Sequence, residues 1–209
     1  MKLLVVGATG LVGRCVLDQA LADSRVSAVV ALTRRGLPPH PKLQAVQVDF
    51  DHLPADEPWW QADAVICALG TTMRVAGSRE AFKRVDYEYP VAVARLARKH
   101  GTPTYVLNSA VAADPSSRVF YLQVKGEVER DLASLNFPSL TFARPGFIGG
   151  NREEFRAYER VMLAVLRAVG FLLPKRWRVN PAPTIARAMI DAALRAEPGT
   201  HVITSDRLV

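Results

Sequence analysis

The sequence has few residues from which a metal centre or a disulfide framework could be built. Its 209 residues include two cysteines, Cys15 and Cys67, and four histidines, which are scattered without metal-ligand spacing. Two cysteines allow at most one disulfide, and both fall in apolar helix or strand patterns, so we expect reduced thiols in the core. We therefore predict that the protein binds no metal.

Long apolar runs are also missing. The longest, such as Val161 to Val169, are short or interrupted by charge, whereas a membrane-spanning helix needs about 20 apolar residues. The first residues run straight into a glycine turn, without the apolar region and cleavage site of a signal peptide. We therefore expect no membrane segment, no secretion and a cytoplasmic location.

Acidic residues are outnumbered, and the formal net charge is +7. Such a charge permits attraction to nucleic acid, to an anionic membrane or to a phosphate-rich ligand. The basic residues are dispersed, and no run of five or six forms a basic tail. We therefore expect no nucleic-acid partner.

Short apolar segments alternate with helical patterns along the chain, which is typical of an α/β protein with a parallel sheet. The predicted helices are 11–22, 79–100 and 118–134, and residues 34–42, with three prolines, are predicted to form a loop. We predict a Rossmann-type, doubly wound sheet of about six or seven strands in the order 3-2-1-4-5-6, within a single domain over 1–209. The predicted strands are 2–6, 27–32, 43–48, 64–68, 104–107 and 139–142.

A glycine-rich motif, GATGLVG over residues 7–13, lies between the first strand and the first helix. Glycines at this place permit a tight turn and close approach of the backbone to a pyrophosphate, which the N-terminus of the helix then binds. A purely structural turn is the alternative. We predict that this motif binds a dinucleotide cofactor through Gly7, Thr9, Gly10, Leu11, Val12 and Gly13.

Two arginines, Arg34 and Arg35, follow the second strand, where an NAD enzyme usually carries an acidic residue. A guanidinium accommodates the 2′-phosphate of NADP through its charge and its planar fork of donors. The two arginines predict NADP(H), unless they only solvate a loop. Asp49, after the third strand, is a candidate to bind the adenine amino group, although it could equally be an exposed loop residue.

Ser109, Tyr121 and Lys125 form a candidate catalytic set. Tyr121 and Lys125 are four residues apart and share one face of the predicted helix, and Ser109 follows a strand that ends at the crevice. The phenol of Tyr121 would protonate a carbonyl oxygen, and this proton transfer requires a neighbouring cation near neutral pH, which Lys125 would supply. Lys125 would also hold the nicotinamide ribose, and Ser109 would donate a hydrogen bond to the substrate oxygen. The alternative is a packed tyrosine beside a solvated lysine.

The glycine motif, the ALGTT segment at 68–72, the Ser-Tyr-Lys set and the RPG segment at 144–146 together resemble the short-chain dehydrogenase/reductase superfamily. More narrowly, 68–72, FKRVD at 82–86 and YLQVKGEVE at 121–129 resemble the atypical subgroup that contains the human Tat-interacting protein of about 30 kDa and its bacterial relatives. The resemblance implies a Rossmann fold, NADP(H) binding that includes Leu69 and Gly70, and the Ser-Tyr-Lys site. Many superfamily members carry an asparagine on the fourth helix, where this chain has Asp86.

An amphipathic helix and loop are predicted over residues 152–177, and we expect the segment 147–185 to cover the substrate side of the crevice. The apolar face of this helix would carry Phe155, Tyr158, Met162, Leu166 and Val169. Two functions are compatible with the pattern. One is an NADPH-dependent oxidoreductase that reduces a small carbonyl substrate, and the other is a non-catalytic NADPH-binding sensor or regulatory protein with a protein partner.

Overall fold

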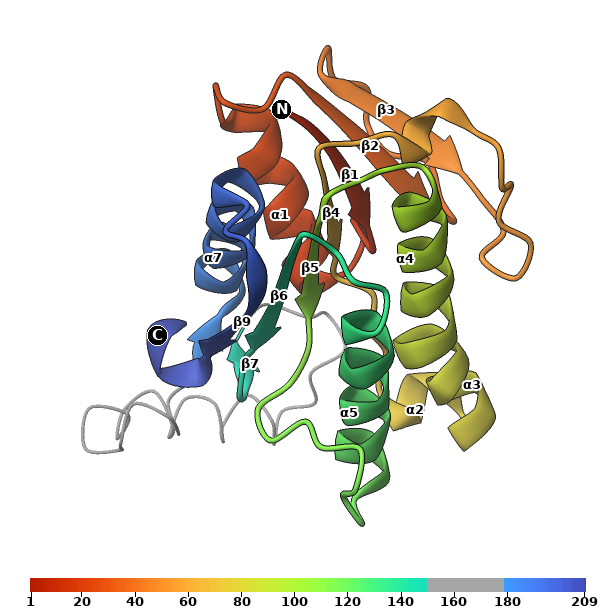
Figure 1. Ribbon diagram of the computed structural model, residues 1–209, viewed down its shortest axis with the longest axis vertical. Helices are drawn as coiled ribbons and strands as arrows, with labels where there is room; N and C mark the ends of the chain where they lie inside the picture. Colours follow the sequence, from red (N-terminus) through yellow and green to blue (C-terminus); the bar gives the residue numbers. More distant parts are fainter. Residues whose placement is uncertain (150–178) are drawn as a thin grey trace.

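Seven parallel strands form one sheet in the middle of the molecule (Figure 1). The computed structural model describes residues 1–149 and 179–209. The strands follow the order β3-β2-β1-β4-β5-β6-β9, which confirms the predicted order and adds β9 beside β6. They are β1 Lys2–Val6, β2 Ala28–Thr33, β3 Leu43–Gln47, β4 Ala64–Cys67, β5 Thr104–Asn108, β6 Ser139–Arg144 and β9 Gly199–Thr204. A separate parallel pair is formed by β7 Ile148–Gly149 and β8 Asn180–Pro181.

Helices cover both faces of the sheet, with α1 and α7 on one face and α4 and α5 on the other (Figure 1). The helices are α1 Leu11–Ala22, α2 Met73–Ala76, α3 Arg79–Lys83, α4 Tyr89–Lys99, α5 Phe120–Ala133 and α7 Ala182–Arg195, with short 3-10 turns at Pro58–Trp60 and Ser205–Arg207. No helix among the described residues is long and apolar enough to cross a membrane.

The central strands are apolar on both faces because helices bury both of them. In β1, Leu3 and Val5 belong to the core beneath α1 and α7, whereas Leu4 and Val6 belong to the core beneath α4 and α5. This explains why β1 reads as a continuous apolar run in the sequence rather than as an alternating one. The predicted loop over 34–42 contains no helix or strand.

The helix predicted over residues 79–100 is divided in the structure. A π-helical segment, Arg84–Glu88, separates α3 from α4, and the N–H group of Tyr89 bonds to the carbonyl of Arg84, five residues earlier. Pro90 follows, and it has no N–H group with which to close an ordinary α-helical turn. The wider turn carries Asp86 inward, where it is 1% exposed.

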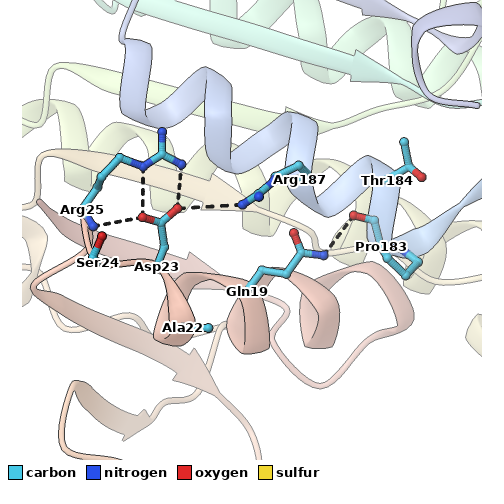
Figure 2. Close-up of a pocket in the computed structure, with 8 residues that line it drawn as sticks. All are labelled: Gln19, Ala22, Asp23, Ser24, Arg25, Pro183, Thr184 and Arg187. Atoms are coloured by element: carbon cyan, nitrogen blue, oxygen red, sulfur yellow. Dashed lines mark hydrogen bonds and ion pairs between the residues drawn. The ribbon is translucent and has the colours of Figure 1, made fainter.

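An open pocket of about 760 Å³ lies between the end of α1 and the start of α7, and Figure 2 shows the residues around it. Asp23 accepts hydrogen bonds from Nη2 and Nε of Arg25 at 2.6 and 3.0 Å. Nη1 of Arg187 lies 3.9 Å from the same carboxylate, and Gln19 donates to the carbonyl of Pro183 at 3.0 Å. The charges in this pocket therefore pair with one another and join α7 to α1.

Replacing Asp23 with asparagine is expected to lower the free energy of unfolding by about 1–2 kcal/mol at neutral pH, because a hydrogen-bonded charge is lost. The side-chain and backbone hydrogen bonds from Arg25 hold the pKa of Asp23 well below its usual value of 3.8. A lowered folded-state pKa gives stability that is present above the unfolded pKa and is lost as the pH falls through the folded value. Urea unfolding should therefore show the two proteins converging below about pH 4.

The matched control is Asp56→Asn, because Asp56 is 85% exposed and its ion pair with Lys99 is solvated. This change should alter the unfolding free energy by less than about 0.5 kcal/mol. Equal stability of Asp23→Asn and the unmodified protein at neutral pH would show that the ion pairs of Asp23 with Arg25 and Arg187 contribute nothing.

Candidate active site

The carboxyl ends of β1 and β4 lie side by side at the point where the order of the sheet reverses. β1 pairs with β2 on one side and with β4 on the other, so the chain leaves these neighbouring strands in opposite directions. Ligands of doubly wound sheets bind in the crevice at such a point.

The glycine turn after β1 has two positions where no side chain would fit. Gly7 has a φ of 86°, and a Cβ placed on it would lie 2.7 Å from the backbone of Ala68 and Leu69. A Cβ on Gly13 would lie 2.0 Å from the carbonyl oxygen of Gly7. The turn therefore brings β1, α1 and the loop after β4 into close backbone contact, which is the cradle that a dinucleotide requires.

The first turn of α1 opens toward this cradle. Gly10 is the N-cap, no side-chain hydrogen bond caps the helix, and its first turn contains no acidic residue. The free N–H groups and the positive end of the helix dipole favour an anion at this place. Thr9 and Gly10 are exposed here, and Gly70 is exposed in the neighbouring loop. These residues fit the pyrophosphate of a dinucleotide.

Arg34 and Arg35 directly follow β2, and both side chains are exposed. The hydroxyl of Thr33 shapes this turn, because it donates to the carbonyl of Arg35 at 2.8 Å and accepts from its N–H at 3.1 Å. Asp49 is exposed after β3, where it accepts hydrogen bonds from His52 and from the N–H of Asp51, both at 2.9 Å. A carboxylate has further lone pairs, so these bonds leave Asp49 able to accept another donor.

A carboxylate that the sequence analysis did not consider lies in the same region. Asp51 accepts a hydrogen bond from the hydroxyl of Tyr89 at 3.0 Å, and Nε of Arg84 is 3.8 Å from it. The pKa of Tyr89 is raised by burial and by this bond to Asp51, and Arg84 and Arg34 oppose the shift. Arg34 therefore belongs to a small group of charged side chains that also contains Asp51 and Arg84.

One face of α5 carries three functional groups at intervals of four residues: the phenol of Tyr121, the ammonium of Lys125 and the carboxylate of Glu129. Tyr121 is 38% exposed, whereas Lys125 and Glu129 are 4% and 5% exposed. The phenol is thus the accessible member, and the two charged groups lie deeper. Tyr121 and Lys125 were predicted from the sequence, whereas Glu129 was not.

Lys125 forms a buried ion pair with Asp86. Its Nζ lies 2.7 Å from Oδ1 of Asp86, and the other oxygen of Asp86 accepts the N–H of Thr71 at 2.8 Å. Burial alone would lower the pKa of Lys125, but the attraction of Asp86 and of Tyr121 outweighs it, so the pKa is raised. Lys125 is therefore a cation whose charge Asp86 already balances.

The phenol of Tyr121 differs in one respect from what we expected. Its pKa is raised rather than lowered, because burial and the carboxylate of Asp86 outweigh the opposing effect of Lys125. The expectation that Lys125 would bring this phenol toward neutrality is therefore corrected. Tyr121 is protonated at neutral pH and is suited to donate a proton rather than to accept one.

Ser109 directly follows β5, and its hydroxyl turns toward α5. Its Oγ donates to Oε1 of Glu129 at 2.5 Å. Arg144, at the end of β6, binds the same carboxylate with both Nε and Nη2. The structure thus joins Ser109 to Glu129 and Arg144, two residues that the sequence analysis had not assigned to the site.

Most of the segment expected to cover the crevice lies outside the described residues. This includes the helix predicted over 152–177, with Phe155, Tyr158, Met162, Leu166 and Val169. At its described borders, the N–H of Asn180 bonds to the carbonyl of Phe147 at 2.8 Å, and Oδ1 of Asn180 accepts the N–H of Gly146 at 2.7 Å. The proposed cover and the extent of the single domain stay predictions.

Residues 1–149 and 179–209 contain no cluster of three or more histidine, cysteine or acidic side chains that could hold a metal ion. Cys67 is buried, and Cys15 is partly buried. Burial raises the pKa of both thiols, most directly that of Cys67. Neither thiol therefore has the low pKa of a reactive nucleophile.

The sequence pattern of a family described as NAD(P)H-binding matches residues 7–161. Protein FMP52, mitochondrial, from Coccidioides immitis is 35% identical over 218 residues, which cover 94% of this chain and 87% of that protein. Protein HTATIP2 from Rattus norvegicus is 34% identical over 216 residues, which cover 100% of this chain and 87% of that protein. These similarities confirm the resemblance stated from the motifs.

Solved structures show the same fold at low sequence identity. MoeE5 in complex with UDP-glucuronic acid and NAD has a TM-score of 0.76 at 17% identity and covers 97% of this chain and 75% of that chain. The PhqB reductase domain from Penicillium fellutanum has a TM-score of 0.68 at 19% identity and covers 97% of this chain and 65% of that chain. The Rossmann-type fold predicted from the sequence is therefore confirmed.

The expected cytoplasmic location is contradicted by the relatives. The similar proteins from Coccidioides immitis, Aspergillus niger and Meyerozyma guilliermondii are all named as mitochondrial proteins. Composition and the scarcity of long apolar runs do not distinguish between compartments inside a cell.

Proposed function

Because the chain belongs to the NAD(P)H-binding family, within the atypical short-chain dehydrogenase/reductase group, we propose that it is an NADPH-dependent oxidoreductase that reduces a small carbonyl substrate. The observation that carries this proposal is the accessible, protonated phenol of Tyr121, one helical turn from the buried cation of Lys125. A protonated phenol beside a crevice is the group that a carbonyl needs as it becomes an alcohol.

The residues of the crevice fit a dinucleotide at each of its parts. The close-packed glycine turn and the uncapped start of α1 would hold the pyrophosphate, and Arg34 and Arg35 would hold the 2′-phosphate. Asp49 would accept from the adenine amino group, and Leu69 and Gly70 would border the cofactor. When bound, NADPH supplies the hydride that the carbonyl carbon receives.

The protein's own groups would position the carbonyl and move one proton. Tyr121 donates its phenolic proton to the carbonyl oxygen as negative charge develops there. Lys125, balanced by Asp86, is fixed one turn deeper, where its positive charge stabilises the phenolate left on Tyr121 and can bind the nicotinamide ribose. The raised pKa of Tyr121 favours the direction of reduction, because its proton is present at neutral pH.

A non-catalytic NADPH-binding sensor is the second candidate. It is favoured by one observation, that the hydroxyl proton of Ser109 and the charge of Lys125 are both engaged inside the protein. Screening NADPH oxidation against aldehydes, ketones and quinones separates the two functions. Consumption of NADPH that depends on a carbonyl supports the reductase, whereas tight NADPH binding without turnover of any class supports the sensor.

NADPH is expected to bind at least about ten times more tightly than NADH. A charge-assisted hydrogen bond between a guanidinium and the 2′-phosphate contributes about 1.5–3 kcal/mol, which is about a tenfold to hundredfold preference. Replacing both Arg34 and Arg35 with alanine should remove most of this preference while NADH affinity is retained. Fluorescence titration of both cofactors at fixed salt measures the effect.

The matched control for this double change is Arg95→Ala, because Arg95 is exposed on α4, away from the glycine turn. It lowers the net charge without touching the proposed phosphate site, and the preference for NADPH should survive it. A preference that is untouched by the double change would show that Arg34 and Arg35 only solvate their loop.

A further inference from the structure

The hydroxyl proton of Ser109 is committed to a carboxylate. Ser109 Oγ donates to Oε1 of Glu129 at 2.5 Å, and Nε of Arg144 donates to the same oxygen at 3.0 Å. The other oxygen of Glu129 accepts Nη2 of Arg144. The two parallel bonds from Arg144 fix the plane of the carboxylate, and Ser109 occupies one of the remaining acceptor positions of Oε1.

The surroundings of this carboxylate keep the hydroxyl in one orientation. Ser109 is 3% exposed and Glu129 is 5% exposed, so bulk water does not compete for the proton. A hydrogen bond to a charged acceptor is roughly twice as strong as one between neutral groups. A neutral carbonyl group would therefore not draw the proton away from Glu129.

We propose that Glu129, held by Arg144, is a positioning residue that makes Ser109 a hydrogen-bond acceptor toward the substrate. A serine oxygen that donates its only proton still has lone pairs that can receive a donor. The site then selects carbonyl compounds that carry a hydroxyl or N–H group beside the carbonyl: Tyr121 donates to the carbonyl oxygen, and Ser109 accepts from the neighbouring donor. This inference deepens the proposed reductase function and rests on it.

Two small probes of matched size test this selectivity by binding rather than by turnover. In 2-hydroxyacetophenone a hydroxyl stands beside the carbonyl, and in propiophenone a methyl group takes its place. Calorimetry with the protein saturated in NADP⁺, which cannot reduce either probe, should show the hydroxy probe binding about threefold to tenfold more tightly, the factor that one neutral hydrogen bond supplies. Ser109→Ala should abolish this preference.

Glu129→Gln should weaken the preference, because an uncharged acceptor holds the serine proton less strongly. The matched control is Glu127→Gln, two residues away on α5, where Glu127 pairs with Lys83 at 3.0 Å, and this change should leave the preference intact. If Glu129→Gln does not fold, Arg144→Lys replaces it, because lysine cannot make both parallel bonds to Glu129, and this change should likewise weaken the preference.

Equal affinities for the two probes, tighter binding of propiophenone, no binding of either, or a preference that survives in Ser109→Ala would each overturn the inference. The proposed reduction is tested separately, by NADPH oxidation with the hydroxy probe. A binding preference without turnover would leave the role of Glu129 standing and show that this probe is not reduced, whereas turnover without a preference would support the reduction and overturn the role of Glu129.

Discussion

Tyr121→Phe is expected to lower kcat on a confirmed carbonyl substrate by about a hundredfold to ten-thousandfold, the range that general acid catalysis contributes. NADPH affinity should change by less than about twofold, because the substitution removes a proton donor and leaves the ring in place. The phenol is 38% exposed and its ring packs edge-on against Phe82, a contact that phenylalanine keeps. Steady-state kinetics and NADPH titration measure the two effects.

The pH dependence of the unmodified protein adds a second check on Tyr121. Because burial raises the pKa of this phenol above its usual value of 10, the donor stays protonated across the neutral range. Reduction should therefore continue without loss until the pH exceeds about 10.

Tyr87→Phe is the matched control for Tyr121→Phe, since the Tyr87 hydroxyl bonds to Asp131 at 2.5 Å, and it should keep full turnover. Unchanged turnover in Tyr121→Phe would refute the assignment.

Lys125→Met is expected to lower the free energy of unfolding by about 3–5 kcal/mol, because it leaves the carboxylate of Asp86 buried without its counter-charge. Asp86→Asn should cost a similar amount, since it leaves a buried ammonium. The double change should be less destabilising than the sum of the two, because neither charge then remains. Urea unfolding of the four proteins gives the coupling energy of the pair.

The pH dependence of this pair has a definite sign. The pKa of Lys125 is raised in the folded protein, so its stabilisation is fully present below the unfolded value of 10.5 and is lost as the pH rises through the folded value. The stabilisation that Lys125 itself contributes should therefore be constant across the neutral range. Additive effects of the two single changes would show that the pair contributes no coupling.

The fold followed from local patterns. The buried strands appear as short runs of valine, leucine and isoleucine, and the glycine turn at 7–13 marks the first crossover, so the order of six strands could be predicted. The division of the helix over 79–100 was missed, although Pro90 was the available signal. A proline near the start of a helix is common, and the wider turn before it depends on packing that the sequence does not display.

The candidate site was predicted only in part, because the missing contacts join distant segments. The buried Asp86 lies in the π-helical segment and pairs with Lys125 on α5. Arg144, at the end of β6, binds Glu129 on α5. The position of Glu129, four residues after Lys125 on the same helical face, was the one signal that could have identified it. The raised pKa of Tyr121 could not be foreseen, since it reflects burial and Asp86 rather than the motif.

Transfer of deuterium from NADPH labelled at C4 of the nicotinamide is the most direct test of the proposed reaction. If the crevice carries out carbonyl reduction, mass spectrometry of the alcohol product should find one deuterium on the former carbonyl carbon, from only one of the two C4-labelled epimers. With Tyr121→Phe the deuterated product should form about a hundredfold to ten-thousandfold more slowly. Tight NADPH binding with no deuterated product from any carbonyl class would contradict the account.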